Sequence, residues 1–293
     1  MIARRFWLVL GLLLLRIFPA QAAGPTIADH FFTTSDGVRL HYLQAGSYQV
    51  RTLVLVPGWT MPAWIWDRQI AAFAAHDRVI AFDPRGQGES AIPATGYTAP
   101  RRGEDIAELL DHLDPSGKQR FVIVAWSLGV LDTLAMVSAQ GDARLAGLVL
   151  VDNSVGEEPP PRPPPYRPPP RHPPSRAQAM AAFVRGMFRR PPSRAWLDQL
   201  TATCLRVPAP AAHALLSYAE PRTFWRQAVY RVRAPVLYVV RPGLAGQAGN
   251  LARGLGAETA IFTDAGHALF IDDAARFNAL LASFLSRRVW PVR

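Results

Sequence analysis

Residues 121–129 read Phe121-Val-Ile-Val-Ala-Trp-Ser-Leu-Gly129, and this stretch decides the fold. An unbroken apolar run leads into a serine, and a helical pattern follows over 128–139. A serine on a sharp turn between a buried strand and a helix is presented as a nucleophile. Because strand and helix pack closely at such a turn, small residues are needed two positions before and after the serine. Ala125 and Gly129 fill these positions, so the stretch predicts a nucleophilic Ser127.

The strand-then-helix pattern recurs along the chain. Short apolar runs predict strands at 52–56, 78–82, 121–125, 145–151, 235–240 and 259–263. Helical patterns follow at 65–75, 103–114, 128–139, 244–255 and 273–287, and two earlier runs, 29–34 and 39–44, predict an antiparallel edge. Continuous apolar strands alternating with helices indicate an α/β fold, a mostly parallel central sheet with helices on both faces. Ligands of such sheets bind beyond the carboxyl ends of the strands.

The alternation breaks between 153 and 233, which predicts an insertion over approximately 155–232. Its first part, 159–174, is proline in most positions and can form only an extended segment. Amphipathic helical patterns follow at 176–190, 193–205, 208–219 and 222–230. An insertion between two central strands is expected to cover the carboxyl edge of the sheet. We therefore predict one α/β domain over 23–293 with a mainly helical cap.

The composition of the chain limits which kinds of binding partner it can have. Its 293 residues fit one large domain, and the net charge of +10 rests almost wholly on arginine, since Lys118 is the only lysine. Basic residues interleaved with aromatic ones on one element would indicate nucleic-acid binding, and the sequence has no such patch. We expect no nucleic-acid partner. A single cysteine, Cys204, excludes an internal disulfide.

The N-terminus has the pattern of an export signal. Arg4 and Arg5 precede an apolar run over 6–15, and Ala20-Gln21-Ala22 resembles a cleavage site. We predict a signal peptide over 1–22 and a bacterial periplasmic or secreted protein. Arg16 interrupts the apolar run, which is shorter than the roughly 20 residues of a membrane span. No stable membrane span is expected after cleavage; an uncleaved anchor is the alternative.

A serine nucleophile needs a base, an acid that orients the base, and donors for the developing oxyanion. The chain holds seven histidines, and His267 is the one that directly follows the last predicted strand, in Asp264-Ala-Gly-His267. A histidine on a glycine-containing loop at the carboxyl edge of the sheet can reach the serine turn. His267 is therefore the predicted base.

Four ordered motifs resemble those of α/β-hydrolases. They are Val-Pro-Gly-Trp at 56–59, Asp-Pro-Arg-Gly-Gln-Gly-Glu-Ser at 83–90, Ala-Trp-Ser-Leu-Gly at 125–129 and Ala-Gly-His at 265–267. The resemblance spans about residues 30–290 and implies an oxyanion hole formed by the backbone amides of Trp59 and Leu128. Asp83 and Arg85 are expected to hold their loop in place rather than to catalyse. The sequence contains no metal-binding motif and no phosphate-binding glycine loop, so we expect neither a metal nor a cofactor.

The acid departs from the family pattern. Members often carry an aspartate after the strand predicted at 235–240, but residues 241–250 contain no carboxylate. Some branches place the acid after the strand that follows the nucleophile helix, and Asp152 occupies that position here. We favour Asp152 as the acid, with Glu157 and Asp264 as weaker candidates. The alternative role for Asp152 is to cap a turn.

These residues predict a serine hydrolase that cleaves a small-molecule carboxylic ester of hydrophobic character through an acyl-enzyme. Trp59 and Trp126 are expected to line an apolar substrate pocket. Related families run epoxide hydrolase chemistry with aspartate at the nucleophile position, and Ser127 argues against it. A cofactor-free haloperoxidase-like or acyltransferase activity with the same triad is the first alternative. The second, motivated by the missing carboxylate at 241–250, is a binding protein on a decayed hydrolase scaffold.

Overall fold

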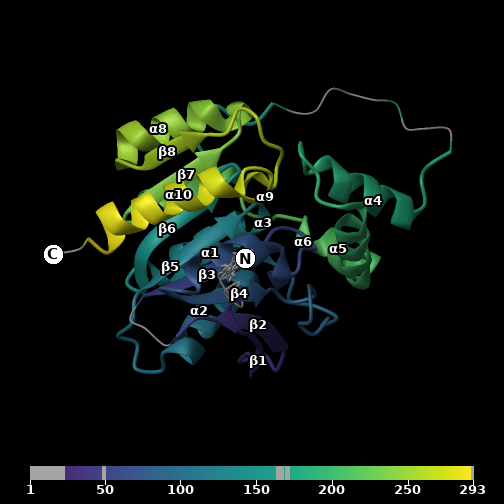
Figure 1. The fold of residues 1–293 in the computed structure, drawn as a ribbon, viewed down its shortest axis with the longest axis horizontal. Helices are drawn as coiled ribbons and strands as arrows, with labels where there is room; N and C mark the ends of the chain where they lie inside the picture. Colours follow the sequence, from purple (N-terminus) through teal and green to yellow (C-terminus); the bar gives the residue numbers. More distant parts are fainter. Residues whose placement is uncertain (1–23, 48–50, 163–167, 169–171, 292–293) are drawn as a thin grey trace, which may run out of the picture.

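A computed structural model describes residues 24–47, 51–162, 168 and 172–291. Within these residues, eight strands form one sheet of order β1-β2-β4-β3-β5-β6-β7-β8 (Figure 1). The strands are β1 Ile27–Thr33, β2 Arg39–Ala45, β3 Thr52–Val56, β4 Arg78–Asp83, β5 Phe121–Trp126, β6 Leu145–Val151, β7 Val236–Val240 and β8 Glu258–Ile261. β1 and β2 are antiparallel to their neighbours, and the other six strands, β3 to β8, run parallel to one another. The α/β fold class is confirmed.

The sheet order reverses around β3. In the sheet β3 lies between β4 and β5, so the chain passes from β3 to β4 on one side and then from β4 across to β5 on the other. In parallel sheets, the crevice at the carboxyl ends of strands beside such a reversal is where ligands bind. β3 and β5 are buried along their whole length, as apolar strands covered on both faces must be. The residues that follow these two strands are 57–60 and 127–129.

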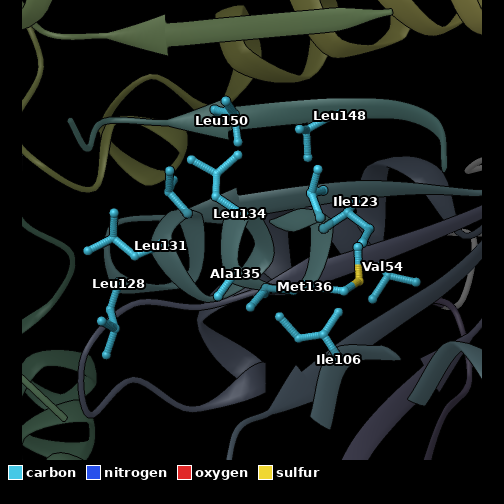
Figure 2. Packing of buried hydrophobic residues seen from close by; sticks show 14 of the residues in the cluster. Val54, Ile106, Ile123, Leu128, Leu131, Leu134, Ala135, Met136, Leu148 and Leu150 are labelled. Carbon is cyan, nitrogen blue, oxygen red and sulfur yellow. The ribbon is translucent and has the colours of Figure 1, made fainter. Parts of the chain in front are cut away.

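Helices cover both faces of the sheet, as expected. They are η1 Ala63–Trp66, α1 Asp67–Phe73, α2 Ala99–Leu113, α3 Leu128–Gln140, η2 Pro242–Leu244, α8 Ala245–Leu255, α9 Leu269–Asp272, α10 Ala274–Phe284 and a π-helical turn, Leu285–Val289. Side chains of α2, α3 and α8 share one core with alternate strand residues such as Val54 and Ile123. Those of α1 and α10 share a second core with the opposite alternation, such as Leu53 and Val122. Figure 2 shows the first core, with Met136 of α3 near Ile106 of α2.

Between β6 and β7 the chain forms four helices, α4 Arg176–Gly186, α5 Arg194–Arg206, α6 Ala209–Leu215 and α7 Arg222–Tyr230. α4, α5 and α6 lie together at one side of the sheet (Figure 1), and we call them the cap. The expected helix 176–190 ends earlier, at Gly186, because the amides of Arg189 and Arg190 donate to the carboxylate of Asp272 instead of to helix carbonyls. The expected helix 273–287 is present as α10, which Asp273 caps at its start, and it passes into the π-helical turn at Leu285.

Two predictions fall partly or wholly outside the described residues. The predicted signal peptide at 1–22 is one, and it stays a prediction. Much of the proline-rich stretch 159–174 is the other. In the described part of the chain, no helix is both long and apolar enough to cross a membrane.

Candidate active site

Ser127 sits on a strained turn between β5 and α3. Its backbone has φ 53° and ψ −121°, a region that non-glycine residues rarely adopt. The turn is held by the Ser127 amide, which donates to the carbonyl of Val151 at 3.0 Å, and by Asn153, whose Nδ2 donates to the Ser127 carbonyl at 2.8 Å. A Cβ on Gly129 would lie 2.6 Å from the carbonyl oxygen of Pro57. Glycine is therefore required there for α3 to approach the loop after β3.

The structure brings Ser127, His267 and Asp152 together. Nε2 of His267 lies 2.8 Å from Oγ of Ser127, and Nδ1 of His267 lies 2.7 Å from Oδ2 of Asp152. The Asp152 side chain is 1% exposed and that of His267 is 23% exposed. Serine and histidine are 140 residues apart in the chain, but each of the three residues follows a strand of the sheet, and these strands end at the same edge. The arrangement can transfer a proton from the hydroxyl to the imidazole while the carboxylate holds the ring.

Asp152 has a second partner, the guanidinium and amide of Arg241. The Arg241 amide donates to Oδ1 at 2.9 Å, and its Nε donates to Oδ2 at 2.5 Å. Burial raises the pKa of Asp152, but the hydrogen bonds and charges of His267 and Arg241 outweigh it and hold that pKa below its ordinary value. The carboxylate is thus ionised and can stabilise a positive charge on His267.

The loop after β3 lies against the serine. Gly58 lies beside the serine, since a Cβ on it would be 3.0 Å from Cβ of Ser127. The amide of Trp59 belongs to the next residue. The amide of Thr60 is already used, since it donates to the side-chain carbonyl of Gln87. The amides of Trp59 and Leu128 donate no hydrogen bond to another described residue. Both are available to an oxyanion, and Leu128 also stands at the positive end of α3.

Backbone strain gathers at this edge of the sheet. Among the described non-glycine residues, positive φ occurs at Thr60, Ser127 and Asp152, with values of 61°, 53° and 46°. The three follow β3, β5 and β6, so each lies where a strand ends beside the others. Such a conformation costs on the order of 1–3 kcal/mol and persists only where the surroundings enforce it. The clustering supports a functional role for this edge.

Trp126 differs from the expectation of a pocket wall. It is 1% exposed, and its ring packs against Phe270 at a centroid distance of 5.0 Å. Its Nε1 donates to the carbonyl of His267 at 2.9 Å. Because successive side chains of a strand point to opposite faces, Trp126 points with Val124 into the core, where it fixes the histidine loop.

The histidine loop is also joined to the end of α4. The carboxylate of Asp272 accepts hydrogen bonds from the amides of Gly266 at 2.6 Å, Arg189 at 2.7 Å and Arg190 at 3.0 Å. The Ala268 amide donates to the carbonyl of Met187 at 3.0 Å. Hydrogen bonds to a buried, charged carboxylate are stronger than those between neutral groups, and Asp272 accepts three of them. It joins the cap to the loop that carries His267.

The weaker candidates for the acid lie elsewhere. Glu157 accepts from the hydroxyl of Tyr230 at 2.6 Å, and Asp264 pairs with Arg189 at 2.7 Å. Asp83 and Arg85 make scaffold contacts, Arg85 with Asp105 at 2.5 Å. In the described part of the chain, no group of three or more potential metal ligands occurs.

Sequence reasoning missed Arg241 and Asp272. Arg241 could have been noticed as a cation in the loop where a carboxylate was sought. Asp272 carries a weaker signal, as an acidic residue in the short helix that follows His267.

A model of the α/β-hydrolase family matches residues 53–280. The chain belongs to this family. A non-heme chloroperoxidase of Streptomyces lividans is 36% identical over 120 residues, which are 41% of this chain and 42% of that protein. A soluble epoxide hydrolase of Corynebacterium sp. (strain C12) is 39% identical over 88 residues, 30% of each chain. The chain thus spans less than half the length of these curated relatives.

Solved structures share the fold over nearly the whole chain. An esterase from Rhodococcus sp. ECU1013 is similar with a TM-score of 0.73 and 22% identity. The match covers 89% of this chain and 99% of the esterase, so it includes most of the residues between β6 and β7.

Proposed function

We propose that this protein is a serine hydrolase that cleaves carboxylic esters with a hydrophobic part. The observation that carries the proposal is the hydrogen-bonded series from Ser127 Oγ through both nitrogens of His267 to Asp152, at 2.8 and 2.7 Å. Membership of a hydrolase family and the likeness in fold to an esterase support it. A serine at the strained turn supports acyl transfer over epoxide opening, which related families run with aspartate at this position.

In the first half of the reaction, Oγ of Ser127 attacks the ester carbonyl carbon and Nε2 of His267 takes the hydroxyl proton. The carbonyl oxygen becomes an oxyanion that accepts hydrogen bonds from the amides of Trp59 and Leu128. One such donor typically contributes 10²–10³ in kcat. The C–O bond to the alcohol then breaks, and His267 gives its proton to the departing oxygen. The acyl group remains on Ser127.

In the second half, a water molecule attacks the acyl carbon while Nε2 of His267 takes its proton. The second oxyanion collapses, the bond to Oγ breaks, and the proton returns to Ser127. The products are one carboxylic acid and one alcohol, and the enzyme is regenerated. Asp152 stays ionised throughout and stabilises the imidazolium.

Labelling by a fluorophosphonate together with hydrolysis of 4-nitrophenyl acetate tests the proposal. We expect the folded protein to be labelled and active, Ser127→Ala to lose both properties, and the exposed Ser283→Ala to keep them. Absence of labelling in the folded wild-type protein would favour a binding protein on a decayed scaffold. Hydrolysis that persists in Ser127→Ala would overturn the assignment of the nucleophile.

A second candidate is acyl transfer to hydrogen peroxide in place of water, which the similarity to a chloroperoxidase favours. Peroxide would attack the same acyl-enzyme, releasing a peroxy acid and restoring Ser127. A halide-oxidation assay with hydrogen peroxide, run with and without acetate, measures this activity. Halide oxidation that needs acetate and disappears in Ser127→Ala would support this route.

A further inference from the structure

A cavity of about 420 Å³ lies between α4, α6 and the loop after β3. Most of its lining is apolar, and the two basic side chains are Arg176 and His213. The lining residues are Trp59, Arg176, Ala179, Met180, Phe183, Ala209, Ala212, His213 and Leu216. Phe183 and Leu216 are large hydrophobic side chains that remain 38% and 46% exposed. Apolar side chains exposed in one concave site indicate a ligand that covers them.

The cavity shares Trp59 with the candidate active site. The indole ring lines the cavity, where its Nε1 donates to the carbonyl of Ala212 at 2.7 Å and its ring meets Phe183 at a centroid distance of 5.0 Å. The backbone of the same residue carries the proposed oxyanion donor. The preceding residue, Gly58, lies beside Ser127, since a Cβ on it would be 3.0 Å from Cβ of Ser127. A substrate held at Ser127 can therefore extend into the cavity.

The volume sets the size of the ligand part. An apolar cavity of roughly 150 Å³ suffices for benzene. A cavity of about 420 Å³ is nearly three times larger, so it has room for two fused rings or a medium-length alkyl chain. This exceeds what an acetyl group needs.

Arg176 gives the cavity a fixed positive charge. Its Nη1 donates to the carbonyl of Leu205 at 3.2 Å and its Nη2 donates to the carbonyl of Val207. A guanidinium has five N–H groups, so three stay available. Arg176 forms no ion pair with a described residue, and the lining contains no carboxylate. An anchored guanidinium without a counter-charge suits a carboxylate or phosphate, which it can bind in a planar, bidentate manner.

We propose that this cavity binds one apolar arm of the ester and that Arg176 recognises an anionic group at the far end of that arm. The inference rests on the proposed function and narrows its substrates to amphipathic esters with an apolar arm and an anionic end. Leu216 and Phe183 then set the length and width of the arm.

Three 4-nitrophenyl esters test the proposal: the acetate, the octanoate, and the suberate monoester, which has the same chain length as the octanoate and a terminal carboxylate. We expect Leu216→Trp, which fills the cavity, to lower kcat/KM for the octanoate by about tenfold or more and to leave the acetate unchanged. We expect the wild-type enzyme to prefer the suberate monoester over the octanoate. Because Arg176 is partly solvated, this preference is about two- to fivefold, and Arg176→Gln removes it.

Arg194→Gln is the matched control, since Arg194 is 94% exposed on α5 and does not line the cavity. It should keep the preference for the carboxylate. Phe183→Ala enlarges the cavity and should raise the relative rate for wider acyl groups, which separates recognition from misfolding of the tryptophan variant. A parallel series of acetate esters of long-chain alcohols shows whether the acyl part or the alcohol part of the ester enters the cavity. A loss in Leu216→Trp that affects the octanoate and spares this series places the acyl chain in the cavity.

Two results would overturn the inference. One is a Leu216→Trp variant that loses acetate and octanoate hydrolysis equally, and the other is an Arg176→Gln variant with an unchanged preference. Either could occur while Ser127 is labelled and the acetate is hydrolysed, in which case the proposed function stands. Absence of acetate hydrolysis and labelling in the wild-type protein would instead reject the proposed function itself.

Discussion

Arg241 binds Asp152 at both carboxylate oxygens, with its amide 2.9 Å from Oδ1 and its Nε 2.5 Å from Oδ2. The second oxygen also lies 2.7 Å from Nδ1 of His267. β6 and β7 are neighbours in the sheet, so the loop that follows β7 reaches the residue that follows β6. This loop contains no carboxylate, and its Arg241 donates the hydrogen bonds that orient Asp152.

Asp152→Asn is expected to lower kcat by about 10⁴-fold, the effect of neutralising a triad acid. The amide keeps the shape of the side chain, but an NH2 group in place of Oδ2 can accept a hydrogen bond from neither His267 nor Arg241. The histidine tautomer that can take the serine proton is then disfavoured. Initial rates with 4-nitrophenyl acetate measure the loss. Glu157→Gln and Asp264→Asn should stay within about threefold of wild type, and the reverse pattern would reject Asp152 as the acid.

Arg241→Gln tests the cation beside the acid. A hydrogen bond to a charged group contributes about 1.5–3 kcal/mol, and partial exposure of Arg241, 44%, places the effect at the lower end. We expect kcat to fall about tenfold with KM unchanged. Arg253→Gln on α8 is the control and should leave kcat as it is. An unchanged kcat in Arg241→Gln would show that the Asp152 carboxylate is held adequately by its other partners.

The same variant has an expected pH dependence of stability. A carboxyl group whose pKa is lowered on folding stabilises the protein above its ordinary pKa of 3.8, and this stability is lost as pH falls through the lowered value. Without Arg241 the folded-state pKa of Asp152 rises, so the variant gains less stability than wild type at pH values where the carboxylate is ionised. Melting temperatures of both proteins between about pH 3 and pH 6 should differ most at pH 6 and converge toward the acid end, where Asp152 is protonated in both.

The sequence was sufficient for the fold class and for where the main side chains lie along the sheet. Apolar strands are local patterns, and Ser127, Asp152 and His267 each follow one of them, so parallel pairing brings them to one edge. The prediction of Trp126 as a pocket wall is wrong, because the alternation of side chains along β5 directs Trp126 into the core. The hydrogen bond from Arg189 to Asp272 joins residues 83 apart, and no local sequence pattern indicates it.

His41 is expected to make stability depend on pH near neutrality. It is buried, with Nδ1 2.6 Å from Asp83 and Nε2 3.0 Å from Asp29. Burial lowers the pKa of His41, but the two carboxylates outweigh it and raise that pKa above 6.5. The resulting stability is full below about pH 6.5 and is lost as pH rises through the raised value. The melting temperature of wild type should therefore exceed that of His41→Gln most at acid pH. A constant difference between pH 5.5 and 8.5 would contradict the charged pairing.

Gly266→Ala tests whether the contact between the cap and the histidine loop supports catalysis. A Cβ on Gly266 would lie 2.3 Å from the carbonyl oxygen of Met187 and 2.9 Å from the amide of Arg189, so the loop must move away from the end of α4. Misplacement of a catalytic group by about 1 Å can cost roughly 10²-fold in rate, and we expect kcat to fall by about that amount. Gly243→Ala is the control, because no atom lies within 4 Å of a Cβ there. Fluorophosphonate labelling rates, measured beside melting temperatures, separate a displaced His267 from general destabilisation. If labelling of folded Gly266→Ala proceeds at the wild-type rate, the cap contact does not position the base.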